Sequence, residues 1–482
     1  MPGTGKDNVE NANTSSSVIP KPLLLILLSG LLAPLAACST KDTVRQDIAA
    51  SRTRSFERWL SEKDAAAQSE GVLKGPLTRE QCVAIALERN KQVAAIIWDK
   101  EKAQGRITEA YASALPRLDL GATLNRVDRS LSGNETTYGL AGTVTQPLYR
   151  GGAVGAGLRA AKIYSYAADE RQKEVIQNVI YDVNKMYYDV LLSQELVRVS
   201  EEAVSLSQKH VEDVTRRRDQ GVASDYDVLR GRVEVTNYEA ELIQNRNRLH
   251  MLKSSFNKLL GVSQESQITF TDQLEYVEEK PALEDAVSEA FLNKPELQQA
   301  ELAVRLQQEG LAVAKSERLP TLDAFFTERY ARPGPHVTSG NGWGEGWTAG
   351  MVLNFPLFDG FRAKGRIRQA RADFEKSRTE LSDAEETVLL SVKQSLLNIE
   401  DARTFVESQK ANVERARQGL VLVEAGYREG VNKELEVRDA RQALLRASSL
   451  HYQAIHQHQA AVLGLKKATG SLHRFDEPRS NE

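Results

Sequence analysis

The sequence has few aromatic residues, few prolines and almost no cysteine. Of its 482 residues, 6% are aromatic, 14 are proline and two are cysteine, Cys38 and Cys82. Two cysteines in unlike contexts exclude a disulfide framework, and Cys82, within an apolar helical stretch, is expected to be a small buried side chain. The scarcity of proline favours long uninterrupted helices. The 63 basic and 66 acidic residues leave a net charge of -3, without the basic excess of a nucleic-acid-binding protein.

Motifs of enzymatic chemistry are also missing. The sequence contains no P-loop, no HExxH and no GxSxG, and the spaced glycines of residues 151–157 lack the strand and helix context of a dinucleotide site. His451, His456 and His458 near the C-terminus are expected to be solvated residues and not a site. We therefore predict a protein that is not an enzyme and that binds no metal and no cofactor.

The apolar run of residues 22–37 is short and interrupted by a glycine and a proline. It is too short for a membrane-spanning helix and is typical of a secretory signal peptide. The run ends in Leu-Ala-Ala-Cys, which resembles the lipobox of bacterial lipoproteins. This resemblance implies cleavage before Cys38 and covalent lipid, palmitate included, on that residue, and Ser39 favours sorting to the outer membrane. The alternative is an ordinary signal peptide with a chance cysteine.

The rest of the chain contains two copies of one unit. Segments of the first half recur in the second half at an offset of 204 residues, and later at an offset of 209. The matching segments are LPRLD (115–119) with LPTLD (319–323), QPLYRG (146–151) with FPLFDG (355–360), and RRRDQGV (216–222) with AGYREGV (425–431). Five extra residues in a loop of the second copy explain the change of offset, so a tandem duplication is predicted.

Each copy is expected to hold the same elements in the same order. A helix comes first (78–115 and 282–318), then two strands, a very long helix (150–219 and 359–428), a glycine turn and a closing helix (225–261 and 433–468). The resulting organisation is a signal peptide (1–37), an N-terminal segment (38–76), the first repeat (77–270), a linker (271–281), the second repeat (282–470) and a tail (471–482).

The long helices carry small and branched apolar residues at intervals of seven. In the first copy the positions are Ile176, Val183, Val190, Val197, Val204 and Val211, and in the second Val392, Ile399, Val406, Val413 and Leu420. A repeat of seven residues predicts knobs-into-holes packing in a left-handed supercoil. The remaining faces are polar, which indicates helices in contact with water.

Residues 117–125 and 347–355 alternate between apolar and polar side chains, and 138–147 and 321–330 do so more weakly. Alternation over about ten residues is the pattern of a transmembrane β-strand, but a half-buried strand in a soluble sheet has the same period. Four strands with open edges are not tolerated in lipid. If these strands span a membrane, three chains supplying twelve strands form a barrel of known size.

Taken together, these features resemble those of the TolC-type outer-membrane channel family, in its lipoprotein branch. The likeness covers residues 77–470 and rests on the duplication, the order of elements and the Pro-Leu-aromatic turns that end in glycine. It implies a mainly α fold with a trimeric twelve-stranded β-barrel and a coiled-coil tunnel through the periplasm. The implied function is the exit duct of tripartite efflux or type I secretion, with a periplasmic adaptor protein and an inner-membrane pump as partners.

The family's gate residues transfer by their distance from the turn glycines, Gly221 and Gly430. Asp227 lies six residues after the first, and Glu436 and Asp439 lie six and nine residues after the second. Three copies of these acids around one axis are expected to form a cation-selective carboxylate ring. The alternative is that they are ordinary surface acids stabilising a helix start.

The turns themselves are expected to contact the adaptor. Tyr427 matches the family's aromatic residue three positions before the second glycine, whereas Asn432 departs from an arginine common at that position. The apolar candidates for adaptor contact are Val222, Ala223 and Val431.

The competing interpretation is a lipid-anchored periplasmic coiled-coil scaffold with a small soluble sheet. Trp347, Met351, Leu353 and Phe355 discriminate between the two, because a solvated sheet would not expose them. The sequence does not distinguish drug cargo from protein cargo.

Overall fold

The computed structural model describes residues 40–68, 74–126, 136–334 and 342–472 and divides the chain into two units, 1–71 and 72–482. In the first unit, helix α2 (Thr40–Gln68) occupies a segment for which the sequence predicted no element. Its described side chains, those of residues 45–61, are exposed. The predicted signal peptide and Cys38 lie outside the described residues. Among the described helices, none combines the length and the apolar character needed to cross a membrane.

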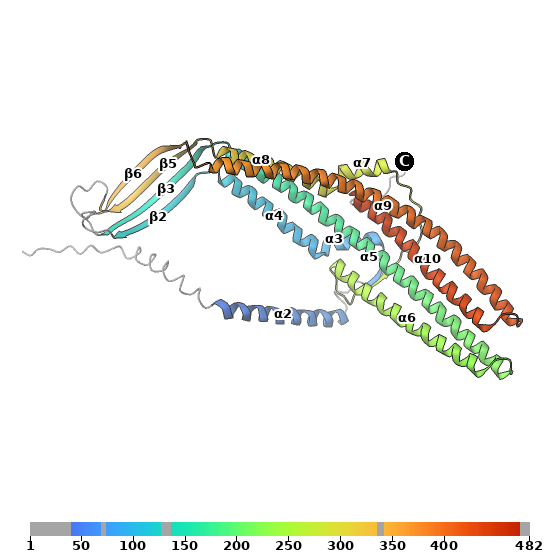
Figure 1. Cartoon of the computed structure of the whole chain (residues 1–482). Coiled ribbons are helices and arrows are strands. Elements are labelled where there is room, and N and C mark those ends of the chain that lie inside the picture. The colour runs from blue at the N-terminus through green and yellow to red at the C-terminus, as the bar shows by residue number, and fades with distance from the viewer. Residues whose placement is uncertain (1–39, 69–73, 127–135, 335–341, 473–482) are drawn as a thin grey trace, which may run out of the picture. The chain divides into compact units, whose positions relative to one another are not determined.

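The second unit contains the predicted duplication (Figure 1). Counterpart helices have matching lengths: 11 residues in α3 and α7, 22 in α4 and α8, and 67 in α5 and α9. In chain order the elements are β1 (Lys74–Leu77), α3 (Arg79–Arg89), α4 (Lys91–Ala112), β2 (Arg117–Arg126), β3 (Thr136–Arg150), α5 (Ala153–Asp219), α6 (Asp225–Leu260), β4 (Gln267–Phe270), α7 (Leu283–Asn293), α8 (Pro295–Ser316), β5 (Thr321–Arg332), β6 (Gly344–Asn354), α9 (Arg362–Arg428) and α10 (Glu434–Ala468).

The first helix of each copy is broken in two, and the prediction of one continuous helix was wrong. In the first copy Asn90 is extended, with φ -66° and ψ 132°, and its side chain accepts a hydrogen bond from the amide of Gln92 at 2.7 Å. In the second copy Pro295 opens α8, and the preceding Lys294 is extended. A proline clashes with a helical residue before it, and an asparagine side chain caps a new helix start. Both breaks therefore have local causes.

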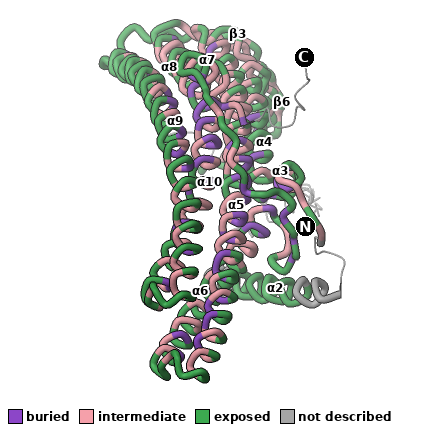
Figure 2. The backbone as a smooth tube through the Cα atoms, turned by 90° about the vertical axis from the view of Figure 1, so that its right-hand side faces the viewer, coloured by how far each residue is buried: buried purple, intermediate pink, exposed green. Residues whose placement is uncertain are grey.

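The long helices pack through the predicted seven-residue pattern. Val183 and Val190 in α5 and Val392 in α9 are fully buried. Ser193, Ser200 and Ser207 of α5 are buried too, in accordance with close helix approach at small residues. α5 contacts α4, α6, α8 and α10, and α9 contacts α8 and α10. Figure 2 shows the buried residues as interrupted stripes along α5 and α10, with exposed residues beside them.

A parallel two-stranded sheet, which the sequence did not predict, ties the start of the first copy to its end. Lys74–Leu77 pairs with Gln267–Phe270, so the residues assigned to the end of the N-terminal segment belong to the helical body. Beside this sheet Tyr187, Phe256 and Phe270 form an aromatic core, with ring centroids 5.1–6.2 Å apart. Cys82 is fully buried in the same core, as predicted, and burial raises the pKa of its thiol to about 12.

The larger sheet has the order β2-β3-β5-β6, with every pair antiparallel. The two copies each supply a hairpin, and the β3–β5 pair joins them. In Figure 1 this sheet lies at one end of α5 and α9, and the turns that follow these helices lie at the other end. Among the described residues, β2 and β6 each pair with one strand and are the edges of the sheet.

Candidate functional site

The strand register places most of the apolar side chains of the four strands on one face. Leu118 of β2 lies opposite Val144 of β3, which lies opposite Phe326 of β5, which lies opposite Ala349 of β6. Directly paired residues point to the same side of a sheet. The side chains on this face that are more than two-thirds exposed are Leu118 (74%), Leu120 (77%), Leu124 (68%), Trp347 (69%), Met351 (70%) and Leu353 (68%). So much exposed apolar surface on one face marks contact with a membrane or with another protein.

The opposite face is mainly polar, with Phe325 and Val352 as exceptions. Thr143 and Thr327 share a hydrogen bond of 3.1 Å between their hydroxyl oxygens, and the Arg150 guanidinium lies 2.8 Å from the Asp323 carboxylate. Arg117 pairs with Asp119 at 2.8 Å on the same side. An apolar outer face and a polar inner face are the two surfaces of a barrel strand in an outer membrane.

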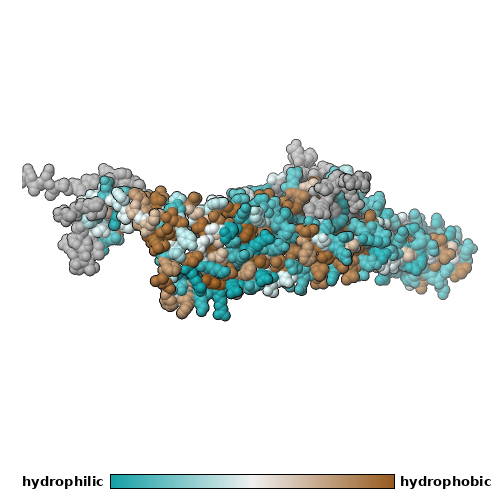
Figure 3. Space-filling view, turned by 90° about the horizontal axis from the view of Figure 1, so that it is seen from above, coloured by the Kyte–Doolittle hydropathy of each residue, from teal (hydrophilic) through white to brown (hydrophobic). Residues whose placement is uncertain are grey.

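Aromatic side chains mark both ends of this sheet. At the loop end the Trp343 ring stacks on Tyr330, with centroids 5.0 Å apart, and lies 6.0 Å from Tyr138. At the helix end Phe358 contacts Phe361 edge to face at 5.5 Å. Figure 3 shows hydrophobic side chains gathered where the strands approach the helices, and mainly hydrophilic ones at the far ends of the helices. Two aromatic belts around an apolar band are typical of membrane β-barrels.

At the far end of the helices both hairpins turn at a glycine with positive φ, Gly221 (77°) and Gly430 (79°). The amide of Val222 donates to the carbonyl of Arg217 at 2.9 Å, and that of Val431 donates to the carbonyl of Gly426 at 2.8 Å. These bonds close the last helical turn, and glycine permits the left-handed residue that they require. The candidate contact residues Val222 and Val431 are 72% and 80% exposed, and Ala223 is half-buried. Their contact with an adaptor stays a prediction.

Two of the three predicted gate acids cap the helices that follow the turns. Asp227 accepts from the backbone amide of Ser224 at 3.0 Å, and Glu436 accepts from that of Lys433 at 3.1 Å. Hydrogen bonds from the Ser224 side chain to Asp227, and from the Asn432 amide to Glu436, hold the pKa of both carboxyls below their ordinary values. The structure therefore gives these two acids the local role that the alternative interpretation assigned to them, and it leaves the ring a prediction.

Asp439, the third acid, has no such role. Its side chain is 62% exposed and lies 3.4 Å from Arg438. A carboxylate that caps a helix still has unused acceptor lone pairs, so Asp227 and Glu436 could cap their helices and also belong to a carboxylate ring. Asp439 would contribute only its charge to the ring.

Sequence reasoning missed the contacts between the two hairpins near the turns. The guanidinium of Arg217 in α5 lies 4.5 Å above the ring of Tyr427 in α9 and donates to the Tyr427 carbonyl at 3.5 Å. The ring of the buried His210 lies 6.2 Å from that of Tyr427, and its Nε2 lies 3.7 Å from Glu434 of α10. The run Arg216–Arg218 was visible in the sequence, but nothing in it indicated which arginine faces the second hairpin.

The buried charges of this cluster are shifted toward their neutral forms. Burial, aided by Arg441, lowers the pKa of His210 to about 4. Burial, followed by the charge of Asp227, raises the pKa of Glu434. Arg441 is itself held by Glu424 at 2.8 Å. The hairpins thus meet through the Arg217 guanidinium on the Tyr427 ring, through the buried His210, and through Glu434, whose carboxyl has a raised pKa.

The expectation of solvated histidines near the C-terminus was wrong. His458 is fully buried, and its ring lies 4.7 Å from that of Tyr276 in the linker. The Nε2 of His456 lies 2.6 Å from Asp189. These side chains pack α10 against the linker and α5, and among the described residues no group of histidine, cysteine and acidic side chains could hold a metal ion.

A membrane-facing sheet joined to long coiled-coil helices that end in glycine turns defines the class of outer-membrane exit channels. The sequence matches the family described as "Outer membrane efflux protein" over residues 83–262 and 286–471, one match for each copy. The chain therefore belongs to the outer membrane efflux protein family, and the predicted TolC-type likeness is confirmed. Members of this family are channels, which agrees with the expected absence of enzymatic activity.

Alignments with known relatives cover most of both chains. The chain is 24% identical over 423 residues to the outer membrane protein TolC of Vibrio cholerae, covering 84% of this chain and 94% of that one. It is 23% identical over 398 residues to TolC of Salmonella enteritidis, covering 78% and 79%.

Solved structures share the fold. A membrane protein from Pseudomonas aeruginosa superposes with a TM-score of 0.72 at 18% identity, covering 81% of this chain and 93% of that one. The outer membrane protein VceC from Vibrio cholerae superposes with a TM-score of 0.70 at 17% identity, covering 81% and 96%. The predicted mainly α fold with a β-barrel portion is confirmed, and the chain is an outer-membrane efflux channel protein and not a scaffold.

Proposed function

We propose that three copies of this chain close a twelve-stranded barrel in the outer membrane and a helical tunnel below it. The carrying observation is the register that turns the apolar side chains of four strands outward on a sheet with two open edges. Open edges in lipid leave backbone groups without hydrogen bonds, and pairing β6 of one copy with β2 of the next removes them. Three hairpin pairs then supply twelve strands, a number within the range of known barrels.

In this assembly the chain is the exit duct for an inner-membrane pump. The glycine turns meet a periplasmic adaptor through Val222, Ala223 and Val431, with Tyr427 supporting the second turn. Two relatives bear on the cargo: TolC, and the cobalt-zinc-cadmium resistance protein CzcC of Cupriavidus metallidurans, which is 22% identical over 407 residues. Efflux of small molecules or ions and type I secretion of proteins use the same duct geometry, so the pump selects the cargo.

The acidic ring is tested by selectivity in planar bilayers. The variant Glu436→Gln, Asp439→Asn removes two charges per chain, and glutamine at position 436 retains the capping hydrogen bond. Since a carboxylate ring attracts cations and repels anions, the wild type is expected to prefer K⁺ over Cl⁻, and the permeability ratio of the variant to move toward one.

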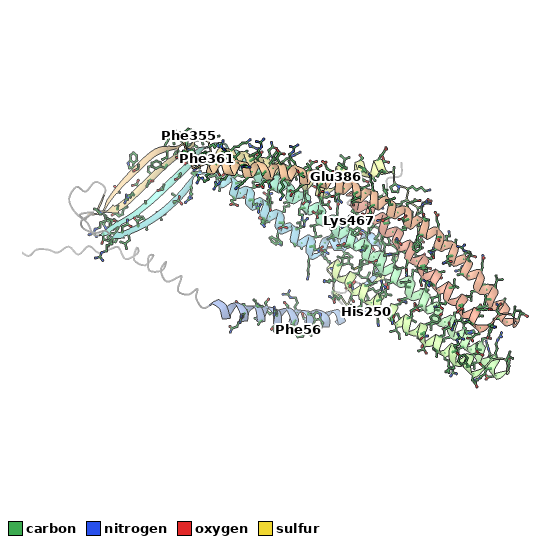
Figure 4. The ribbon with its side chains drawn as sticks, viewed as in Figure 1. Phe56, His250, Phe355, Phe361, Glu386 and Lys467 are labelled. Atoms are coloured by element: carbon green, nitrogen blue, oxygen red, sulfur yellow. The ribbon has the colours of Figure 1, made fainter. Side chains whose placement is uncertain are left out.

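The matched control is Glu385→Gln, Glu386→Gln, which removes two exposed charges from α9, far from the turns (Glu386 is labelled in Figure 4). Its selectivity is expected to equal that of the wild type. Equal selectivity in all three proteins would remove Glu436 and Asp439 from the gate. Trimers that insert but conduct no current would contradict the channel itself.

The lipid anchor is tested by metabolic labelling with palmitate. Cys38→Ser is expected to abolish the label, because only a cysteine thiol at the cleavage site accepts the diacylglyceryl group. The trimer is expected to stay in the outer-membrane fraction, since the barrel provides a far larger apolar surface than one lipid anchor. Cys82→Ser is the control. It should retain the label, because it keeps Cys38, and because the fully buried Cys82 is not accessible to acylation. Label on the Cys38→Ser protein would refute the anchor.

A further inference from the structure

The start of α9 carries an unusual concentration of positive charge. Five of its first ten residues are basic, and the first acidic residue is Asp373; its first turn contains no acid. A helix N-terminus bears a partial positive charge, so cations there are unfavourable, and like charges four residues apart repel. The basic residues are Arg362, Lys364, Arg366, Arg368 and Arg371. A local electrostatic penalty of this kind is expected where function requires it.

The first copy is an internal control. At an offset of 209 residues, α5 has Ala153, Gly155 and Gly157 where α9 has Arg362, Lys364 and Arg366. Both helices start after the same kind of strand-to-helix turn and contain 67 residues. The other two cations, Arg368 and Arg371, correspond to Arg159 and Lys162, which are also basic. Arg159 forms an ion pair of 2.8 Å with Glu309, so the first copy lacks the three cations nearest the turn and neutralises one of the remaining two.

Three of the cations share one face of α9. Lys364, Arg368 and Arg371 are spaced i, i+4 and i+7, which places them in one row. All three are exposed, and no carboxylate among the described residues lies within ion-pair distance of them. Arg366, outside this row, instead forms an ion pair of 2.6 Å with Glu317 at the end of α8. We call Lys364, Arg368 and Arg371 the basic row.

An exposed apolar loop immediately precedes the basic row in the sequence. Leu357, Phe358 and Phe361 in the β6–α9 turn are 87%, 77% and 68% exposed. Phe361 has a left-handed φ of 67°, the only such non-glycine residue in the described chain, where the first copy has Gly152. Backbone strain of this kind is found where a side chain has to be presented. Figure 4 shows Phe355 and Phe361 close to each other at the junction of strand and helix.

Contact with this loop shows which way the basic row faces. The Nζ of Lys364 lies 5.8 Å from the centroid of the Phe361 ring, so the row begins at the edge of the apolar surface that continues from β6. Arg368 and Arg371 follow about 6 and 10 Å further along the helix at 1.5 Å per residue. The headgroup layer of a bilayer is about 5–8 Å thick on each side, and long side chains extend back toward it.

We propose that the basic row binds the phosphate groups of anionic phospholipids in the periplasmic leaflet, while Phe358 and Phe361 lie at the boundary of the acyl chains. The proposal rests on the barrel lying in the outer membrane, as proposed above. Charge complementarity selects an anionic lipid over a zwitterionic one, and arginine forms paired hydrogen bonds with phosphate. Bound lipid offsets the repulsion within the row and sets the depth of the barrel in the membrane.

The test measures lipid binding to the full-length protein. Purified delipidated protein is titrated with phosphatidylglycerol or phosphatidylcholine, and bound lipid is counted by native mass spectrometry. We expect Lys364→Gln, Arg368→Gln, Arg371→Gln to weaken phosphatidylglycerol binding by about two orders of magnitude, since each surface cation contributes about fivefold. Phosphatidylcholine binding should stay unchanged, and the difference between the two lipids should shrink as salt is raised.

The matched control is Lys393→Gln, Arg415→Gln, Arg417→Gln, which removes one lysine and two arginines that are exposed further along α9. It should bind both lipids as the wild type does. Equal phosphatidylglycerol binding in wild type and the basic-row variant would overturn the proposal. An equal loss of both lipids, or dissociation of the variant into single chains, would also overturn it by assigning the row to subunit packing. Failure of the channel function would appear separately, as absent conductance of the wild type in phosphatidylcholine bilayers.

Discussion

Replacing Arg217 with alanine is expected to raise the mean conductance of the reconstituted channel about tenfold or more. The guanidinium on Tyr427 is a cation–π contact between the two hairpins near the turns, and a partly desolvated contact of this kind contributes roughly 0.5–2 kcal/mol. In the proposed trimer the variant loses three such contacts. The equilibrium between closed and separated hairpins therefore shifts toward separation, which opens the end of the tunnel. Single-channel recording at fixed salt measures the effect.

Substitutions at Tyr427 show which part of the contact matters. Arg217 contacts the ring face and the backbone carbonyl of Tyr427, so Tyr427→Phe should conduct as the wild type does, and Tyr427→Ala should resemble Arg217→Ala. The neighbouring Arg216→Ala is the control. Both arginines pair with Asp213 on their own helix, but the Arg216 side chain is 71% exposed and that of Arg217 only 23%. If Arg216→Ala and Arg217→Ala raise conductance equally, the effect is one of charge at the mouth and not of the hairpin contact.

Replacing Gly261 with alanine is expected to destabilise the protein by about 2–4 kcal/mol. Gly261 ends α6 with φ 75°, and a Cβ there would lie 2.3 Å from the carbonyl oxygen of Arg89. Neither the left-handed backbone nor the contact with a main-chain atom can be relieved by moving a side chain. Gly470 repeats the arrangement in the second copy, where a Cβ would lie 2.7 Å from the carbonyl oxygen of Asn293.

Denaturant unfolding in detergent, followed by circular dichroism, measures this loss for Gly261→Ala and Gly470→Ala. The control is Gly419→Ala in α9, where the added carbon has no neighbour within 4 Å apart from the adjoining backbone of its own helix. Alanine in a helix interior is favoured over glycine, so this variant should gain about 0.5–1 kcal/mol. A Gly261→Ala protein as stable as the wild type would mean that α3 is free to move away from the end of α6.

The sequence was most informative where structure follows from local periodicity. The duplication, the long helices and the four strands could all be predicted, because spacings of seven and two residues are visible without any knowledge of tertiary contacts. The broken first helices were predictable in part, since Pro295 marks one break. The other break depends on the capping hydrogen bond of the Asn90 side chain. The sequence alone does not distinguish a capping asparagine from one inside a helix.

Long-range pairing was not visible. The strand Lys74–Leu77 is short and contains glycine and proline, so its pairing with residues 267–270 depends on a partner nearly two hundred positions away. The same holds for Arg217 and Tyr427, which lie 210 residues apart. The gate acids were a case in which the signal was local. Ser224, three positions before Asp227, is a capping signal. The distance of an acid from the glycine alone did not distinguish a capping role from a role at the pore.

The β1–β4 pair also sets an order of folding. Both strands precede the second copy in the sequence, so the ends of the first copy can join before the second copy has been made and exported. Domains generally fold from the N-terminus during synthesis, and a contact across some 190 residues forms slowly because a large loop has to close first. The β3–β5 pair, in contrast, needs both copies. The helical body of the first copy can therefore be complete before β5, the partner strand of β3, has been made. The apolar sheet then assembles last, after export, where the outer membrane can accept it.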